Sequence, residues 1–179
     1  MGHLYFIRHG ETVWNVANKI CGSEDVELTE LGHSQGIETG KRILEEGIKA
    51  DVILHSPLIR AQDTAAHISE ITGIPAVSEP RLTEQHFGSW ESKPRDSKEF
   101  EKTKESFVYS YDGGESTLRV AQRVYNLLDE ITAEDCDKTY IIVAHNGISR
   151  VLRSYFYDMT NEEYACFGVG NCEIVRYDF

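Results

Sequence analysis

Short apolar runs alternate with longer amphipathic stretches along this chain. The apolar runs predict strands at residues 3–8, 51–55, 75–79, 139–144 and 172–178. Between them, apolar residues recur every three or four positions, which is typical of helices that bury one face. Strands alternating with helices favour a mostly parallel sheet. The pattern therefore predicts an α/β fold, a three-layer αβα sandwich with helices on both faces of the central sheet, as a single domain over residues 1–179.

Capping residues and glycines place the ends of the helices. Thr29 and Ser56 can each cap a helix, and Pro57 suits the first position of the second one. Gly47 and Gly73 can end these two helices. The helices expected from these signals and from the apolar periodicity span about 30–46, 57–72, 117–133 and 147–157, with a short one after Thr160.

One segment breaks this alternation. Residues 89–113 are rich in Lys, Glu, Ser and aromatic residues and run into two glycines. We expect an excursion over the edge of the sheet, partly helical near 95–107. It is either a solvated surface loop or a lid above a binding site, and the sequence leaves both interpretations open.

Positively charged and protonatable residues follow three of the predicted strands. The first strand runs into Arg8 and His9, the second leads into a helix that carries Arg60, and the fourth ends at His145. Ligands of open α/β sheets bind at the carboxyl ends of the strands. Two arginines and two histidines at this edge predict an anion site that contains a candidate nucleophile.

The overall composition restricts the partners. A net charge of −12 and a pI near 5.0 argue against general binding to nucleic acid or to anionic membranes. The four cysteines, Cys21, Cys136, Cys166 and Cys172, have no metal-type spacing, and no signal-peptide pattern opens the chain. We expect a cytoplasmic protein with reduced cysteines, whose partner is a small anionic molecule. The sequence does not decide between a monomer and a homo-oligomer.

His9 is the candidate nucleophile. A neutral imidazole can attack phosphorus and carry the phosphoryl group, provided that one ring nitrogen is free and the other donates to a fixed acceptor. Arg8 and Arg60 would stabilise charge on the phosphoryl oxygens, because the planar guanidinium group suits phosphate. A metal site is the rival use of His9 and His145, but the neighbouring arginines would repel a cation. We therefore expect neither a metal nor another cofactor.

A leaving alkoxide needs a proton, and Glu84 is the candidate donor. It lies in a loop after the third predicted strand, at the same edge of the sheet. A carboxyl group among apolar residues such as Phe87 and Trp90 can be kept in its neutral, proton-donating form. Glu91 and Glu115 are weaker candidates for this role.

Several motifs in order give the chain a family resemblance. Arg8-His9-Gly10-Glu11-Thr12 with Trp14-Asn15 resembles the signature of the histidine phosphatase superfamily, the phosphoglycerate mutase-like proteins. Four further segments are similar to later motifs of that family: Ser56-Pro57 with Arg60, Glu84 with Phe87-Gly88, Gly113-Gly114-Glu115-Ser116, and Val143-Ala144-His145. The resemblance covers almost the whole chain.

The resemblance implies a role for each matching residue. His9 would be phosphorylated, and Arg8, Arg60 and His145 would hold the phosphate. Glu84 would donate the proton and later activate water. Asn15 matches an asparagine that also touches the phosphate, and Cys21-Gly22 lies where relatives contact the phosphate or the substrate. No metal takes part in this mechanism.

Two positions depart from the family pattern. Asn146 follows the second histidine where relatives usually have Gly, so its side chain can add a contact or narrow the pocket. Ser92 replaces a second common Gly within the excursion. We include Asn146 among the candidate substrate-binding residues.

The resemblance favours a metal-independent phosphomonoesterase that acts on a small-molecule phosphate ester. The alternative is a phosphoglycerate mutase, which would return the phosphoryl group to the product. Mutases have Arg and Tyr where this chain has Gln85 and Phe87, and they are longer. A catalytically silent binder of phosphorylated ligands is the third hypothesis. Sugar phosphates, phosphoglycerates, α-ribazole phosphate, nucleotides and phosphoproteins remain open as substrates.

Overall fold

A five-stranded sheet forms the middle layer of the molecule. The computed structural model describes residues 2–133 and 138–179. The strands are β1 (His3–Arg8), β2 (Val52–His55), β3 (Ala76–Ser78), β4 (Tyr140–Ala144) and β5 (Ile174–Asp178). Their order is β3-β2-β4-β1-β5, and β5 alone among them pairs antiparallel, at the edge beside β1. The predicted mostly parallel sheet is confirmed.

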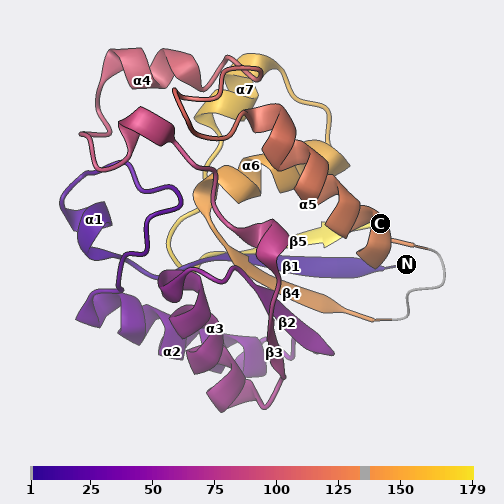
Figure 1. Cartoon of the computed structure of the whole chain (residues 1–179). Helices are drawn as coiled ribbons and strands as arrows, with labels where there is room; N and C mark the ends of the chain where they lie inside the picture. Colours follow the sequence, from indigo (N-terminus) through magenta and orange to yellow (C-terminus); the bar gives the residue numbers. More distant parts are fainter. Residues whose placement is uncertain (1, 134–137) are drawn as a thin grey trace.

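Helices cover both faces of the sheet, which confirms the expected three layers (Figure 1). One face carries α2 (Glu30–Glu45) and α3 (Ile59–Thr72), and the other carries α5 (Thr117–Ile131) and α6 (Asn146–Phe156). The shorter elements are α1 (Val13–Val16), α4 (Lys98–Thr103), α7 (Asn161–Cys166) and the 3-10 turns η1 (Pro80–Leu82) and η2 (Gly88–Trp90).

Alternation along the strands divides the core between the two faces. In β1, Leu4 and Phe6 belong to the cluster under α5 and α6, whereas Tyr5 and Ile7 belong to the cluster under α2 and α3. In β4, Ile142 and Ile141 divide between the faces in the same way. Burial on both faces explains why the strands read as continuous apolar runs.

Most predicted helix ends are confirmed, but the start of α3 is not. Thr29 accepts a hydrogen bond from the Gly32 amide, as a cap should. Ser56 was expected to cap α3, yet the N-cap residue is Leu58, which has no capping side chain. Asp25 takes over from a distant loop, since its Oδ1 accepts from the Ile59 amide at 2.7 Å. Ser56 is left for another contact, described below.

The loop after β1 lies directly on the first turn of α2. A Cβ atom on Gly10 would come within 2.4 Å of the Gly32 carbonyl oxygen, and one on Gly32 within 2.1 Å of the Glu11 carbonyl oxygen. Neither glycine has a positive φ angle. These glycines are therefore needed for close backbone approach and not for an unusual turn. The contact fixes the position of the loop that carries His9.

The excursion of residues 89–113 contains one short helix, α4, within the expected helical range. Its apolar side chains form a separate cluster in which Phe87, Phe100 and Tyr111 pack with Ile20 from the loop before α2. Phe87 meets both Phe100 and Tyr111 edge to face. The excursion is thus anchored on the body of the domain by aromatic packing. Its role as a lid stays a prediction.

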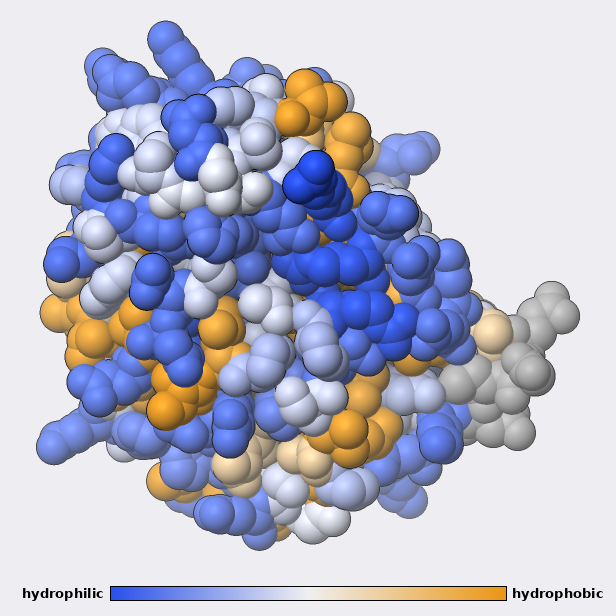
Figure 2. Space-filling model, in the orientation of Figure 1, coloured by the Kyte–Doolittle hydropathy of each residue, from blue (hydrophilic) through white to orange (hydrophobic). Residues whose placement is uncertain are grey.

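The surface seen in Figure 2 is mostly hydrophilic, with apolar side chains in scattered groups. Cys21, Cys166 and Cys172 are free thiols, and Cys136 lies outside the described residues. Among the described residues, no helix is both long and apolar enough to cross a membrane.

The close contact at Gly32 gives a stability prediction. Gly→Ala inside a helix normally stabilises it by about 0.5–1 kcal/mol. Here we expect Gly32→Ala to lower the free energy of unfolding instead, by on the order of 1–3 kcal/mol, because the methyl group meets backbone. Urea unfolding measures this. Ser34→Ala, on the exposed side of the same helix, is the control and should be close to neutral. A stabilised Gly32→Ala variant would contradict the packing argument.

Candidate active site

A cavity opens at the carboxyl ends of β1 and β4, beneath the excursion. Its empty volume, open mouth included, is about 760 Å³. The lining combines cationic, aromatic and amide side chains: Arg8, Asn15, Ile20, Cys21, Glu84, Gln85, Phe87, Arg95, Phe100, Lys104, Tyr111, Thr117, Asn146, Gly147, Arg150 and Tyr164. His9, Arg60 and His145 do not line it, and each is at most 5% exposed. They form a buried group linked to the wall through Arg8 and Gly147, their sequence neighbours.

His9 has the geometry expected of a nucleophilic imidazole. Its Nδ1 lies 2.7 Å from the Gly10 carbonyl oxygen. A carbonyl oxygen only accepts, so Nδ1 carries the proton and Nε2 keeps its lone pair. Burial, followed by the charges of Arg60 and Arg8, holds the pKa of His9 well below 6.5. The ring is therefore neutral near pH 7 with a free Nε2.

His145 and Arg60 form a hydrogen-bonded unit beside His9. The two imidazole rings lie 5.2 Å apart between centroids. Arg60 Nε donates to His145 Nδ1 at 3.2 Å, which leaves the proton of the neutral ring on Nε2. That nitrogen lies 2.7 Å from Ser56 Oγ. Both ring nitrogens of His145 thus have protein partners. Ser56 Oγ also accepts from the Leu58 amide at 3.3 Å, so it contacts the N-cap residue of α3 and not the first turn of the helix.

Arg60 is fixed by backbone carbonyl groups. Its Nη1 donates to the Glu24 carbonyl at 2.8 Å and its Nη2 to the Gly22 carbonyl at 2.7 Å. Each Nη atom carries a second hydrogen, because the guanidinium group has five N–H donors. Arg60 can therefore keep these contacts and still donate to a bound anion. Since its partners are neutral, its positive charge is oriented but not neutralised.

Arg8 approaches the same place from the end of β1. Its Nη1 donates to the Val169 carbonyl at 2.8 Å, whereas its buried Nε has no hydrogen-bond partner within the described structure. Burial and the nearby Arg95 lower the pKa of Arg8 to about 10, so it remains a cation at neutral pH. An unpartnered buried N–H costs free energy, and a phosphate oxygen is an acceptor that would satisfy it.

Glu84 lies against the first turn of α6. Its Oε2 accepts from the Gly147 amide at 2.9 Å, and its Oε1 accepts from the Gln85 amide at 2.8 Å. Glu84 is 5% exposed and lines the cavity. These contacts place a single carboxyl group close to the buried histidines, because Gly147 is two residues after His145. The site thus has a candidate proton donor on the cavity wall.

The two weaker candidates for this role have structural contacts instead. Glu115 makes a two-pronged ion pair with Arg123, with distances of 2.8 and 2.9 Å. Glu91 accepts three backbone N–H groups, from Gly22, Ser23 and Phe87, at 2.9–3.1 Å. Neither residue lines the cavity.

Glu91 ties the excursion to the loop that holds Arg60. The Gly22 amide donates to Glu91, while the Gly22 carbonyl accepts from Arg60. The backbone of Gly22 thus has partners within the protein, and its contact with the phosphate stays a prediction. Cys21 does line the cavity, and burial raises the pKa of its thiol to about 11. Cys21 therefore offers a neutral contact.

The two asparagines predicted at the site both line the cavity. Asn15 Oδ1 accepts from the Thr12 amide at 3.0 Å, and Asn146 Oδ1 accepts from the Val169 amide at 2.9 Å. With each oxygen engaged, the side-chain NH₂ groups remain as donors. Asn146 also fixes Val169, whose carbonyl holds Arg8. The unusual residue after His145 therefore positions Arg8 indirectly.

Three cations of the cavity were not among the predicted site residues. Arg95 and Lys104 come from the excursion, and Arg150 comes from the middle of α6. Arg95 Nη2 donates to the Lys19 carbonyl and Arg150 Nε to the Phe167 carbonyl. The enrichment of the excursion in Lys was visible in the sequence, but no periodicity indicated which of its cations face inward.

The arrangement can hold an anion next to a neutral imidazole. Arginines and amide side chains converge there, and a carboxyl group lies on the wall. Among the residues that the structure describes, no group of three or more His, Cys, Asp or Glu could hold a metal ion. The donor set thus suits a phosphoryl group.

Comparisons with known proteins agree with this donor set. The profile described as "Histidine phosphatase superfamily (branch 1)" matches residues 4–179. A Yersinia pestis protein named "Probable phosphoglycerate mutase GpmB" is 31% identical over 186 aligned positions, covering 100% of this chain and 86% of the relative.

Two solved structures also superpose closely. A mycobacterial glucosyl-3-phosphoglycerate phosphatase complexed with VO3 has a TM-score of 0.85 and 28% identity, covering 98% of this chain and 90% of that one. A phosphoserine phosphatase mutant from Entamoeba histolytica, in complex with phosphoserine, has a TM-score of 0.82 and 29% identity, covering 100% and 91%. Together with the buried histidine pair, these matches show that the chain belongs to the histidine phosphatase superfamily, whose members are phosphatases or mutases.

Proposed function

We propose that this protein is a metal-independent phosphomonoesterase that hydrolyses a small-molecule phosphate ester through a phosphohistidine intermediate. One observation carries the proposal: His9 is neutral, its Nδ1–H is fixed on the Gly10 carbonyl, and Arg8 and Arg60 flank it. This arrangement leaves Nε2 as a nucleophile in a positive field. A cationic field also disfavours a metal ion, so we assign the charge stabilisation to the arginines.

In the first step, Nε2 of His9 attacks phosphorus and the ester P–O bond breaks. The Glu84 carboxyl group gives its proton to the leaving oxygen, which departs as an alcohol. Arg8, through its unpartnered Nε, and Arg60, through its second Nη hydrogens, donate to the phosphoryl oxygens. The hydrogen bond from Nδ1 to the Gly10 carbonyl supports the positive charge that forms on the ring.

In the second step, water attacks the phosphohistidine and the P–N bond breaks. Glu84, now a carboxylate, takes a proton from the water, and His9 leaves as the neutral ring. The products are inorganic phosphate and the starting enzyme, so the cycle balances. In this scheme His145 acts as a positioning residue, because its Nδ1 holds Arg60 and its Nε2 is engaged by Ser56.

Relatives support both hydrolysis and its alternative. The two structural neighbours are named as phosphatases, whereas the Yersinia relative is named as a phosphoglycerate mutase. Gln85, whose amide nitrogen donates to the Glu115 carbonyl, stands where the mutase pattern has Arg, which favours hydrolysis. Incubation of 3-phosphoglycerate with added 2,3-bisphosphoglycerate separates the two functions. Phosphate release should exceed formation of 2-phosphoglycerate, and rapid interconversion without release would overturn the proposal.

The nucleophile assignment is tested by His9→Ala. We expect this variant to lose essentially all turnover of p-nitrophenyl phosphate in excess EDTA, because both ring nitrogens of the neighbouring His145 have protein partners. Reactions of the wild type with a ³²P-labelled ester, stopped in alkaline SDS because a phosphohistidine hydrolyses in acid, should retain label on the protein, and His9→Ala should not. His33→Ala is the control, because His33 contacts His67 and does not line the cavity. Retained turnover by His9→Ala would rule out the assignment.

The acid assignment is tested by Glu84→Gln, which keeps the size of the side chain but removes its proton transfer. We expect kcat to fall by on the order of 10²–10⁴ for alkyl esters and much less for p-nitrophenyl phosphate, whose leaving group needs no proton. Glu38→Gln, on the exposed face of α2, should change neither rate. Equal losses on both ester types would argue against Glu84 as the donor.

The lowered pKa of His9 predicts the acid side of the rate profile. An imidazole with pKa 6.5 would lose about tenfold in kcat/KM between pH 7.5 and 5.5. Since burial and the arginines hold the pKa of His9 well below that value, we expect kcat/KM for p-nitrophenyl phosphate to change less than about threefold over this range. A tenfold loss with an apparent pKa near 6.5 would contradict the assignment.

Folding must be monitored in the same experiment. His9 and His145 both have lowered pKa values in the folded state, so below about pH 6.5 the unfolded chain binds more protons than the native one. Stability that is fully present above pH 6.5 is then lost as the pH falls, at up to about 1.4 kcal/mol per pH unit for each histidine. Circular dichroism at pH 5.5 separates unfolding from titration of the nucleophile.

A further inference from the structure

The cavity wall beyond the reacting centre carries more positive charge than one phosphoryl group needs. A phosphate monoester is close to a dianion at neutral pH, and Arg8 and Arg60 together match that charge. Arg95, Lys104 and Arg150 line the same cavity in addition. The proposed reaction gives these three residues no role.

The charges of the three additional cations are not neutralised within the protein. Arg95 and Arg150 donate to the main-chain carbonyl groups of Lys19 and Phe167, at 2.9 and 2.8 Å. None of the ion pairs among the described residues includes Arg95, Lys104 or Arg150. Partly buried charges without counter-charges cost free energy, and a bound anion would reduce that cost.

The three cations also act on one another. Burial lowers the pKa of Arg95, and the charge of Arg150 lowers it further. Burial lowers the pKa of Lys104 as well. The charge of Arg150 lowers it further, Glu101 raises it, and Arg95 makes a smaller lowering contribution. All three residues line the same cavity, so they form one cationic patch on its wall.

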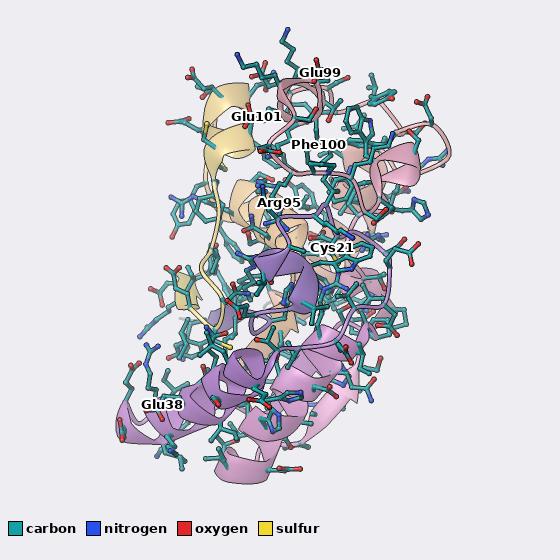
Figure 3. The ribbon with its side chains drawn as sticks, turned by 90° about the vertical axis from the view of Figure 1, so that its left-hand side faces the viewer. Cys21, Glu38, Arg95, Glu99, Phe100 and Glu101 are labelled. Carbon is teal, nitrogen blue, oxygen red and sulfur yellow. The ribbon has the colours of Figure 1, made fainter. Side chains whose placement is uncertain are left out.

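Acidic side chains are directed away from this patch. Glu84 is the one acid among the lining residues, and it belongs to the reacting centre. In Figure 3, Cys21, Arg95 and Phe100 follow one another toward α4, while Glu99 and Glu101 lie beyond Phe100 at the outer end. Both of these glutamates are exposed, whereas Phe100 is 3% exposed. The helix thus presents its acids to solvent and not to the cavity.

Aromatic side chains surround the cationic patch. Phe87, Phe100, Tyr111 and Tyr164 line the cavity, and the Lys104 ammonium lies 5.4 Å from the centre of the Phe100 ring. These rings exclude water from one side of the patch, which strengthens its interaction with an anion.

We propose that the substrate is a small phosphomonoester that carries a second anionic group, a carboxylate or a second phosphate, and that Arg95, Lys104 and Arg150 bind this group. The inference rests on the proposed phosphatase function and names its substrate class. Arg95 and Lys104 are the specificity-determining residues contributed by the excursion, and Arg150 completes the patch from α6. The excursion then serves recognition as well as cover.

Matched esters test the substrate class. 3-Phosphoglycerate and glycerol 3-phosphate differ only by a carboxylate in place of a hydroxymethyl group. Glucose 1,6-bisphosphate and glucose 6-phosphate differ by a second phosphate. In one of the two pairs, we expect wild-type kcat/KM, measured by phosphate release, to be at least about tenfold higher for the ester that carries the second anionic group. The reason is that charge-assisted hydrogen bonds are stronger than hydrogen bonds between neutral groups. The pair that shows the preference identifies the anion.

Two variants assign the preference to the patch. Arg95→Met and Lys104→Met each remove a charge while keeping an apolar stem, and each should reduce the preference ratio at least about fivefold, mainly through KM. Lys102→Met is the control, because Lys102 is exposed on α4 and does not line the cavity. Its ratio should equal that of the wild type. Two separate variants keep the test informative if one of them folds poorly.

Different results would contradict the phosphatase function and the proposed substrate class. If the wild type hydrolyses none of the esters, nor p-nitrophenyl phosphate, the proposed function is wrong. If it hydrolyses them with equal efficiency within both pairs, the phosphatase function stands and the inference is overturned. A wild-type preference that Arg95→Met and Lys104→Met both leave unchanged would also overturn the assignment of the second anionic group to this patch.

Discussion

The site depends on burying positive charge against neutral partners. Arg8, Arg60, Arg95 and Arg150 each donate to main-chain carbonyl oxygens, and no carboxylate pairs with any of them among the described residues. A carbonyl group orients a guanidinium through its dipole but leaves the net charge in place. Had acids held these arginines, the charges would be cancelled before an anion arrived. Carbonyl partners give the orientation of an ion pair together with a field that only a ligand can neutralise, at a cost in stability that the two apolar cores must offset.

Those carbonyls belong to loops, so the loops themselves have to be held. The Glu91 carboxylate fixes the loop whose carbonyl groups hold Arg60, because it accepts three backbone N–H groups from two separate segments. Asn146 fixes Val169, whose carbonyl group accepts from Arg8. The close contact between Gly10 and Gly32 fixes the loop after β1. Side chains that never meet the substrate thus set the geometry of those that do, which is the usual requirement for preorganised charge stabilisation.

Much of this could be predicted from the sequence, and the failures have identifiable causes. Strands buried on both faces are recognisable in the sequence as apolar runs. Parallel strands end at the same edge of the sheet, so the proximity of His9, Arg60 and His145 could be predicted from the sequence. Ser56 was misassigned because local signals favour capping, whereas α3 begins two residues later than predicted and the Ser56 hydroxyl contacts Leu58 N and a histidine 89 residues later. The roles of Gly22 and Glu91 depend on long-range backbone contacts. Arg95 and Lys104 lie in a segment without periodicity, so nothing local distinguishes them from Lys102, which faces solvent.

The overall charge and the local charge of the molecule act in opposite directions. A net charge of −12 repels anions at a distance, although salt screens exposed charges beyond about 8 Å under physiological conditions. An anion therefore meets attraction only once it is within the mouth of the cavity, where partly buried cations are screened much less. Recognition under these conditions relies on short-range contacts and not on long-range steering. Such a site distinguishes ligands by how many of their anionic groups contact fixed donors. A cationic patch in the cavity would therefore affect the choice of substrate more than the association rate.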